Sequence, residues 1–162
     1  MTAILRPHQS RLLEQLDDVF AQGCTRIVAQ APTGFGKTIV AAHRLRCVQD
    51  AGKRAIFIVP ALSLIDQTVE KLYAENVRDI GVIQANHLLT NYARPIQIAS
   101  VQTLQRREMP LADEIIIDEV HRWYQFYPRL LNDPRYAATP IIGLSATPWT
   151  RGLGKHFSRL VP

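Results

Sequence analysis

One short stretch of the chain carries the residue types that hold a phosphate group. Residues 31–38 read Ala-Pro-Thr-Gly-Phe-Gly-Lys-Thr, the phosphate-binding loop pattern with alanine in place of its first glycine. Gly34 and Gly36 permit a tight turn in which successive backbone N–H groups point at phosphate oxygens. Lys37 supplies a cation for the β- and γ-phosphates, and Thr38 supplies a hydroxyl for Mg²⁺. The alternative is a chance Gly-Lys-Thr at a surface turn, which the strand expected before it and the helix expected after it disfavour.

A second stretch places two carboxylates side by side. Residues 115–121 read Ile-Ile-Ile-Asp-Glu-Val-His, so Asp118 and Glu119 follow directly on an apolar run. Two acids at the end of a buried strand are costly unless a cation or a proton accompanies them. The expected cation is Mg²⁺, held by Asp118 through water, while Glu119 orients and deprotonates an attacking water. Lys37, Asp118 and Glu119 are therefore the candidate catalytic residues, and Thr38 and Asp118 are the candidate Mg²⁺ ligands of an ATP site.

The elements that must position these residues follow from the spacing of apolar side chains. We expect strands at residues 26–29, 55–59, 80–83, 96–99, 114–118 and 141–144. Helices are expected from Pro7 to a stop at Gly23, at residues 38–50 and at residues 62–74. Strands that are apolar on both faces are typical of a parallel sheet covered by helices on each side. The predicted fold is therefore α/β with a central, mostly parallel sheet and helices on both faces, and chemistry is expected at the carboxyl ends of the strands.

Length, composition and charge fit one compact globular domain. The chain has 162 residues, of which 47% are hydrophobic and 20% are charged, and its formal net charge is +5. This basic balance is compatible with nucleic acid, although a merely soluble basic protein would show it too. Near the end of the chain, a local basic face or a solvated tail is expected from Arg151, Lys155, His156 and Arg159.

The sequence gives no sign of a structural metal or of a membrane segment. Cys24 and Cys47 have no metal-ligand spacing, and we expect reduced thiols, with one disulfide between them left open. The histidines at positions 8, 43, 87 and 156 share no metal spacing either. The longest apolar stretch, residues 55–65, contains Pro60 and is too short to span a bilayer, and the N-terminus lacks a signal-peptide pattern. A cytoplasmic protein with no membrane partner is expected.

These motifs, in this order, resemble a known family. Residues 118–121, Asp-Glu-Val-His, resemble the second motif of superfamily 2 helicases of the DExH type, and residues 145–147, Ser-Ala-Thr, resemble the third. Residues 5–9 are similar to the adenine-reading segment of such domains, and residues 59–67 and 99–104 are similar to two motifs that contact nucleic acid. The resemblance covers nearly the whole chain. It is closest to the group that contains phage recombination helicases, XPB-like repair helicases and restriction-enzyme motor subunits.

The resemblance implies a RecA-like P-loop domain and a role for each motif. Contacts to ATP are expected from Arg6, Gln9, Thr33, Gly34, Phe35, Gly36, Lys37 and Thr38. Coupling between the nucleotide and the nucleic acid is implied for His121, Ser145 and Thr147, and backbone contacts to nucleic acid are implied for Pro60, Ala61, Ser100 and Thr103. Each assignment has a plainer alternative: a glutamine on a first helix is often merely exposed, and Ser-Ala-Thr before a proline also suits a strand that runs into a turn. Val120 stands where the family usually has alanine.

An aromatic cluster follows the two acids. Trp123, Tyr124, Phe126 and Tyr127 could stack nucleic-acid bases. The helical spacing of Trp123, Tyr127 and Leu130 favours packing onto the sheet instead.

The function implied for residues 1–162 is that of a helicase ATP-binding domain, the first of two RecA-like lobes in an ATP-dependent nucleic-acid motor. DNA is favoured over RNA by the closeness of the group. The sequence ends soon after the third motif, so the second RecA-like lobe is expected in the parent protein or in trans, and this lobe alone is expected to be nearly inactive. Two alternatives stay open: a motor subunit of a restriction system, and a non-catalytic module that binds ATP and docks a partner.

Overall fold

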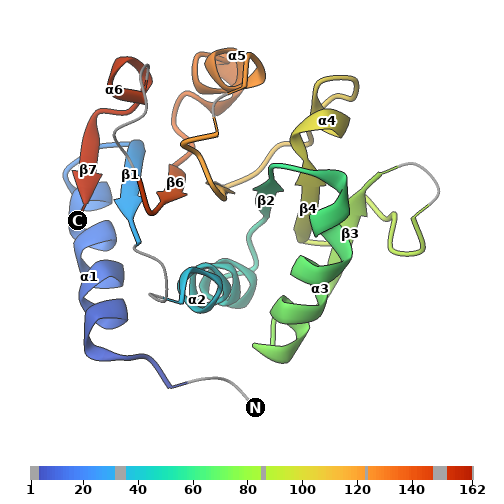
Figure 1. The fold of residues 1–162 in the computed structure, drawn as a ribbon, viewed down its shortest axis with the longest axis horizontal. Helices are drawn as coiled ribbons and strands as arrows, with labels where there is room; N and C mark the ends of the chain where they lie inside the picture. Colours follow the sequence, from blue (N-terminus) through green and yellow to red (C-terminus); the bar gives the residue numbers. More distant parts are fainter. Residues whose placement is uncertain (1–3, 32–35, 85–86, 123, 148–152, 162) are drawn as a thin grey trace.

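One parallel sheet organises the computed structural model, which describes residues 4–31, 36–84, 87–122, 124–147 and 153–161. Its seven strands lie in the order β3-β4-β2-β5-β6-β1-β7, and each pair of neighbours is parallel (Figure 1). The predicted α/β fold with a central parallel sheet is confirmed.

The elements agree closely with the predicted ones. The strands are β1 (Arg26–Gln30), β2 (Ala55–Val59), β3 (Ile80–Ile83), β4 (Ile96–Ser100), β5 (Glu114–Ile117), β6 (Ile141–Ser145) and β7 (Arg159–Val161). The helices are α1 (Pro7–Ala21), α2 (Lys37–Asp50), α3 (Ile65–Ala74), α4 (Val101–Leu104), α5 (Phe126–Leu131) and α6 (Leu153–His156), with short 3-10 turns η1 (Leu62–Leu64) and η2 (Pro134–Tyr136). The helix predicted from residue 62 begins as the 3-10 turn η1, Asp118 lies just beyond its strand, and β1, α2, β4 and β6 are each one residue longer than predicted. The short elements α4, α6 and β7 were not predicted.

Helices cover both faces of the sheet, as the apolar strands require. Side chains alternate between the two faces of the sheet. Ile27 and Ala29 therefore belong to the core between the sheet and α1, α2 and α3, while Val28 belongs to the core between the sheet and α4, α5 and α6. Figure 1 shows α1, α2 and α3 below the sheet and α4, α5 and α6 above it. Phe126, Tyr127 and Leu130 are buried in the second core, which confirms packing for these side chains. Trp123 lies outside the described residues.

The end of the chain is part of the sheet. Ile27, Val28 and Ala29 of β1 align with Arg159, Leu160 and Val161 of β7, so the alternative of a solvated tail is wrong. Lys155 and Arg159 are exposed, as a basic face requires, and Arg151 lies outside the described residues. No helix within the described ranges is long and apolar enough to cross a membrane.

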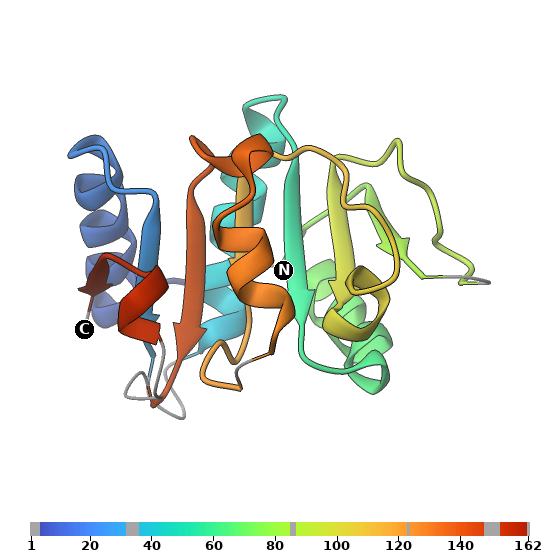
Figure 2. The same ribbon diagram turned by 90° about the horizontal axis from the view of Figure 1, so that it is seen from above.

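The strand order decides which loops meet. β6 lies between β1 and β5, so the segments that leave β1 and β5 flank the end of β6. All three strands point the same way and finish at the lower edge of the sheet in Figure 2. The phosphate loop follows β1 and the paired acids follow β5, so the topology brings the two motifs to one edge.

A buried ion pair holds the opposite edge of the sheet. Arg44 of α2 donates to Glu114 at the start of β5, with Nη2–Oε1 at 2.5 Å and Nε–Oε2 at 3.2 Å. Their side chains are 13% and 6% exposed. Arg44 also donates to Asp17 of α1 at 2.6 Å, but the Asp17 side chain is 70% exposed. One guanidinium therefore joins two helices to a central strand, and most of its desolvated contact is with Glu114.

Replacing Glu114 by alanine is expected to destabilise the chain by about 3–5 kcal/mol, because it leaves the buried Arg44 charge without its main partner. Asp17→Ala removes only the exposed partner and is expected to cost less than about 1 kcal/mol. Urea unfolding of both variants measures the difference. Equal losses would show that the burial of Glu114 does not govern the strength of this pair.

Candidate nucleotide-binding site

Backbone hydrogen bonds to neighbouring strands hold the segments that leave β1 and β5. The N–H of Ala31 donates to the carbonyl of Ser145 at 2.8 Å, and the N–H of Val120 donates to the carbonyl of Leu144 at 3.0 Å. On the other side, the N–H of Asp118 donates to the carbonyl of Ile58 at 2.9 Å. These bonds extend the ladders of the sheet beyond β1 and β5 and fix where the next side chains begin.

The start of α2 has the backbone geometry that a phosphate loop needs. Gly36 precedes the helix with φ of 82°, a left-handed conformation that favours glycine. A Cβ at this position would lie 2.4 Å from Nε2 of Gln9, so no larger residue fits without movement of Gln9. Lys37 and Thr38 then open a helix of 14 residues, whose first N–H groups form the positive end of its dipole. Thr33, Gly34 and Phe35 lie outside the described residues.

Gln9 is buried beside Gly36, at the start of α2. Only 1% of the residue is exposed, so the alternative of a merely exposed helical glutamine is wrong. Its Oε1 accepts a hydrogen bond from the backbone N–H of Arg6 at 2.8 Å, and the contact with Gly36 places its amide next to the start of α2. Arg6 itself is exposed. The structure therefore brings Gln9, and the backbone of Arg6, to the same place as the phosphate loop.

Lys37 meets both acids of the second motif. Its Nζ forms an ion pair with Oε1 of Glu119 and lies 3.9 Å from Oδ1 of Asp118. Glu119 has φ of 51°, an uncommon conformation for a residue other than glycine, and its N–H donates to Oδ1 of Asp118 at 2.9 Å. The left-handed turn directs Glu119 back toward α2. The three side chains are between 21% and 31% exposed, so the cluster is half-buried but open to a ligand.

Burial makes the ionised form of Asp118 unfavourable. Desolvation raises the pKa of Asp118 above its ordinary value, and the negative charge of Glu119 adds to this rise. The charge of Lys37 and the hydrogen bond from the Glu119 N–H act in the opposite direction but do not cancel it. A carboxylate of this kind gains most from a bound cation.

His121 and Ser145 connect the acid cluster to the end of β6. Nδ1 of His121 lies 2.8 Å from the hydroxyl of Ser145, and its Nε2 lies 3.3 Å from Oε2 of Glu119. The Ser145 oxygen also accepts the N–H of Thr147 at 3.0 Å. One neutral tautomer satisfies all three contacts: Ser145 donates to Nδ1, and Nε2–H donates to Glu119. The three residues expected to couple the motifs thus form one hydrogen-bonded chain that begins at Glu119.

Val120 and Gly143 fit one another across β5 and β6. Val120 is fully buried, and a Cβ at Gly143 would lie 2.7 Å from its Cγ1. The larger side chain at position 120, where the family usually has alanine, therefore depends on the glycine opposite. The sequence shows a glycine two residues before Ser145, but that this glycine makes room for Val120 becomes clear only from the pairing of β5 with β6.

The residues expected to contact nucleic acid gather at the ends of β2 and β4. Val59 and Ser100 are partners across these strands, so Pro60 and Ala61 lie beside the start of α4. Ser100 is fully buried, and its hydroxyl caps α4 by accepting the N–H of Thr103 at 3.3 Å. The buried Ser100 side chain thus stabilises the start of α4.

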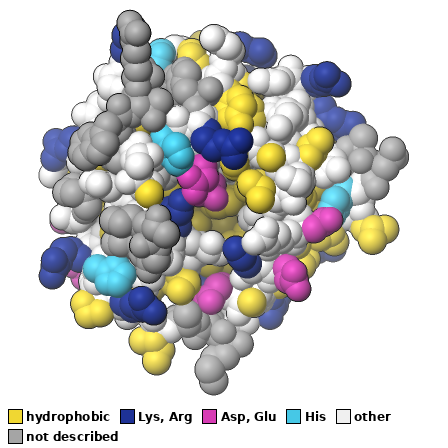
Figure 3. All heavy atoms as spheres, in the orientation of Figure 1, with side chains coloured by type: hydrophobic (Ala, Val, Ile, Leu, Met, Phe, Trp, Pro, Cys, Tyr) yellow, Lys and Arg dark blue, Asp and Glu magenta, His cyan; other side chains and the backbone are white. Residues whose placement is uncertain are grey.

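Tyr124 is a contact that sequence reasoning missed. Its hydroxyl donates to the carbonyl of Pro60 at 3.3 Å, so it joins the segment after His121 to the end of β2. No feature of the sequence indicates this bond, because it depends on how the turn after β5 folds back. Figure 3 views the molecule from the edge where the strands end and shows acidic side chains near the centre of that face, next to basic and histidine side chains.

Comparison with known proteins identifies the family of the chain. The family model described as "Type III restriction enzyme, res subunit" matches residues 2–150. Among curated proteins, the probable helicase HelY of Mycobacterium tuberculosis is 28% identical, over 82% of this chain but only 16% of its own length.

Solved structures share the fold. The SWI2/SNF2 ATPase core of Sulfolobus solfataricus, solved in complex with dsDNA, matches 98% of this chain and 36% of its own with a TM-score of 0.72 and 17% identity. The UvsW helicase of bacteriophage T4 matches 98% of this chain and 60% of its own with a TM-score of 0.76 and 14% identity. The chain belongs to the family of the type III restriction enzyme res subunit, and its fold is that of the RecA-like lobe of superfamily 2 helicases.

Proposed function

We infer that the chain binds and hydrolyses ATP as the first motor lobe of a DNA helicase or translocase. One observation carries the inference: Lys37, at the start of α2, meets Asp118 and Glu119 at the end of β5. A cation that follows a left-handed glycine, opposite two half-buried carboxylates, suits a triphosphate and its metal ion.

The residues present fit Mg²⁺ with ATP. Thr38 and Asp118 offer hard oxygen ligands, and Mg²⁺ completes its shell with water and phosphate oxygens. Among the described residues, no three carboxylates, histidines or cysteines converge in a metal-binding cluster, so a cation held by an all-protein cage is not supported. Gly36 has a left-handed backbone and packs directly against the Gln9 amide, at the start of a helix whose first N–H groups suit a phosphate. Arg6, Gln9 and residues 33–38 are the proposed nucleotide contacts.

The ion pair of Lys37 with Glu119 bears on catalysis. Bound MgATP would supply the phosphoryl group and a positive charge beside it. With MgATP bound, Lys37 would pair with the phosphates in place of Glu119, and Glu119 would then be free to orient a water and accept its proton. The His121 imidazole contacts both Glu119 and Ser145, so a change at Glu119 would alter the hydrogen bonds of Ser145 and Thr147.

Several features support a nucleic-acid substrate. The net charge is +5, and the ends of β2 and β4 place Pro60, Ala61, Ser100 and Thr103 together. Since Ser100 is buried, its contribution is to shape α4, and contacts to a phosphodiester backbone fall to its neighbours. The dsDNA in the SWI2/SNF2 structure favours DNA.

The residues 1–162 form one helicase ATP-binding domain in this proposal, and a second RecA-like lobe completes the cleft. The chain spans 16% of the length of the curated relatives, which leaves ample room for that lobe in a longer protein. The description of the family model favours one alternative, a motor subunit of a restriction system. A nuclease or specificity segment in the parent gene would identify that case.

Lys37→Ala is expected to weaken Mg²⁺-dependent ATP binding by roughly tenfold or more, because a charge-assisted contact to phosphate is lost. Lys53→Ala is the matched control, since Lys53 is exposed and lies just before β2 at the other edge of the sheet. Calorimetric titration measures both variants. Equal affinity of the wild type and Lys37→Ala would refute the nucleotide site.

Asp118→Asn is expected to raise the melting temperature near neutral pH when Mg²⁺ is absent. The folded-state pKa of Asp118 is raised, so its contribution to stability is present at low pH and is lost as pH rises through that pKa. The gain from asparagine should therefore shrink as pH falls through the raised pKa of Asp118 and vanish below about pH 4, the ordinary pKa of aspartic acid in an unfolded chain.

Asp133→Asn is the control of opposite sign. Hydrogen bonds from Arg135 lower the pKa of Asp133, so its contribution is present at neutral pH and is lost on acidification. Thermal unfolding across pH compares the two variants. A gain from Asp118→Asn that does not depend on pH would contradict the assigned cause.

The purified chain is expected to hydrolyse ATP very slowly, with or without single-stranded DNA. An arginine from the second lobe is expected to neutralise the far side of the phosphoryl group, and such a residue is worth on the order of 10³ to 10⁵ in rate. Steady-state hydrolysis is measured beside Glu119→Gln, which reveals contaminating activity. Robust DNA-stimulated turnover that disappears in Glu119→Gln would overturn the need for a second lobe but support the ATPase site.

A further inference from the structure

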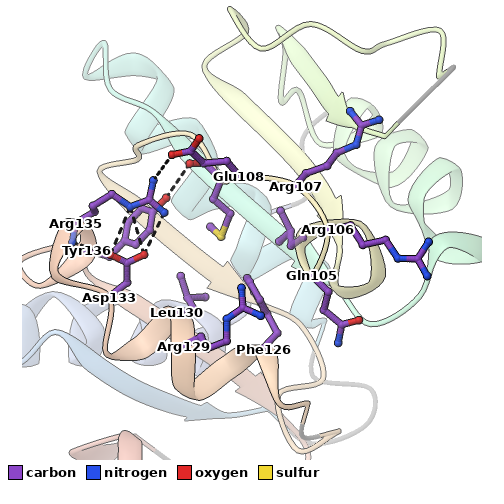
Figure 4. Close-up of a pocket in the computed structure, with 12 residues that line it drawn as sticks. Gln105, Arg106, Arg107, Glu108, Phe126, Arg129, Leu130, Asp133, Arg135 and Tyr136 are labelled. Carbon is purple, nitrogen blue, oxygen red and sulfur yellow. Dashed lines mark hydrogen bonds and ion pairs between the residues drawn. The ribbon is translucent and has the colours of Figure 1, made fainter.

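A groove lies on the face of the sheet that α4, α5 and α6 cover, between α5 and residues 105–109. Its volume is about 350 Å³, and Figure 4 shows the side chains around it. Buried Met109, Phe126 and Leu130 underlie it, so its shape is set by the core. We call it the α5 groove. None of the residues assigned to ATP or to the motor cycle lines it.

The groove has more positive than negative charge, and its acids are already engaged. Arg135 binds Glu108 at 2.9 Å and Asp133 at 3.1 Å, which closes one end of the groove (Figure 4). Arg129 extends from α5 into the space that faces residues 105–109, while Arg106 lies at the rim of the groove and extends outward. In the part of the chain that the structure describes, no carboxylate lies within 4.0 Å of Arg106 or Arg129.

An apolar surface continues from the closed end. A second, shallower hollow of about 600 Å³ shares Glu108, Met109 and Arg135 with the groove. Leu111 is 62% exposed there, and Tyr92 is 42% exposed. Exposed aliphatic and aromatic side chains beside a charged groove are typical of surfaces that bind other proteins.

This combination fits a peptide better than a nucleic acid. A phosphodiester backbone presents negative charge at every step, and the exposed Glu108 carboxylate would oppose it along the path from Arg129 to Leu111. A nucleic acid also has little aliphatic surface to place on Leu111. A peptide can alternate carboxylates, which pair with Arg129 and Arg106, and an apolar side chain, which covers Leu111.

We propose that the α5 groove and the adjoining Leu111 surface bind a short acidic segment of a partner protein that carries at least one large apolar residue. Carboxylates of the segment pair with Arg129 in the groove and with Arg106 at its rim, and the apolar side chain packs on Leu111 and Pro110. The groove lies on the face of the sheet that α4, α5 and α6 cover, and Lys37 and Glu119 do not line it. A bound segment therefore leaves these two residues free to act.

The test selects short random peptides on the 162-residue chain and then measures how the enriched peptides bind Arg129→Glu. Arg11→Glu is the matched control, since Arg11 is an exposed arginine of α1 on the opposite face and the charge change is the same. We expect enrichment of Asp and Glu together with Leu, Ile or Phe on the wild type and on Arg11→Glu. Fluorescence anisotropy should then show a loss of affinity of roughly tenfold or more for Arg129→Glu and for Leu111→Asp.

Thermal unfolding and ATP binding by Arg129→Glu show that the variant is folded. The proposal is overturned if no acidic and apolar pattern is enriched, or if Arg129→Glu retains the selected peptides. It is also overturned if oligothymidylate binds in an Arg129-dependent manner while acidic peptides do not, because the groove would then serve nucleic acid.

Discussion

Parallel hydrogen bonding between β1, β6 and β5 is the constraint on which the site depends. Parallel strands all end at one edge, so β6 holds the segments that leave its two neighbours a fixed distance apart. The sheet bonds made by Ala31 and Val120 carry this order beyond the strands themselves. The meeting of Lys37 with Glu119 is thus a product of strand order, and the helices contribute by covering the faces.

The site stores several unfavourable features in one place. Asp118 is partly desolvated, Glu119 has a left-handed backbone, and the two carboxylates are adjacent. Each feature lowers the stability of the nucleotide-free chain, and Lys37 offsets only part of it. The Arg44–Glu114 pair has the opposite character, since both of its charges are matched and its position is far from the reacting edge. The stabilising ion pair therefore lies at the start of β5, and the unfavourable features lie just beyond its end.

Local patterns predicted most of the fold and named the residues that the structure brings together in the candidate site. Apolar runs such as residues 115–117 marked the strands, and the spacing of glycine, lysine and acids marked Lys37, Asp118 and Glu119. The remainder depended on contacts distant in sequence. The burial of Gln9 needs Gly36, and the groove around Arg129 needs the path of residues 105–109, which no periodicity encodes.

The close contact between Val120 and Gly143 limits the order in which these two positions can be substituted during evolution. While valine occupies position 120, any side chain at position 143 meets its methyl groups, so the glycine cannot change first. A smaller residue at 120 would release that restriction, and the two positions would then drift together. Val120, directly after Glu119, is therefore held to β6 by this packing as well as by the hydrogen bond from its N–H to the carbonyl of Leu144. We therefore expect positions 120 and 143 to covary in related chains, because their side chains compete for the same space between the second and third motifs.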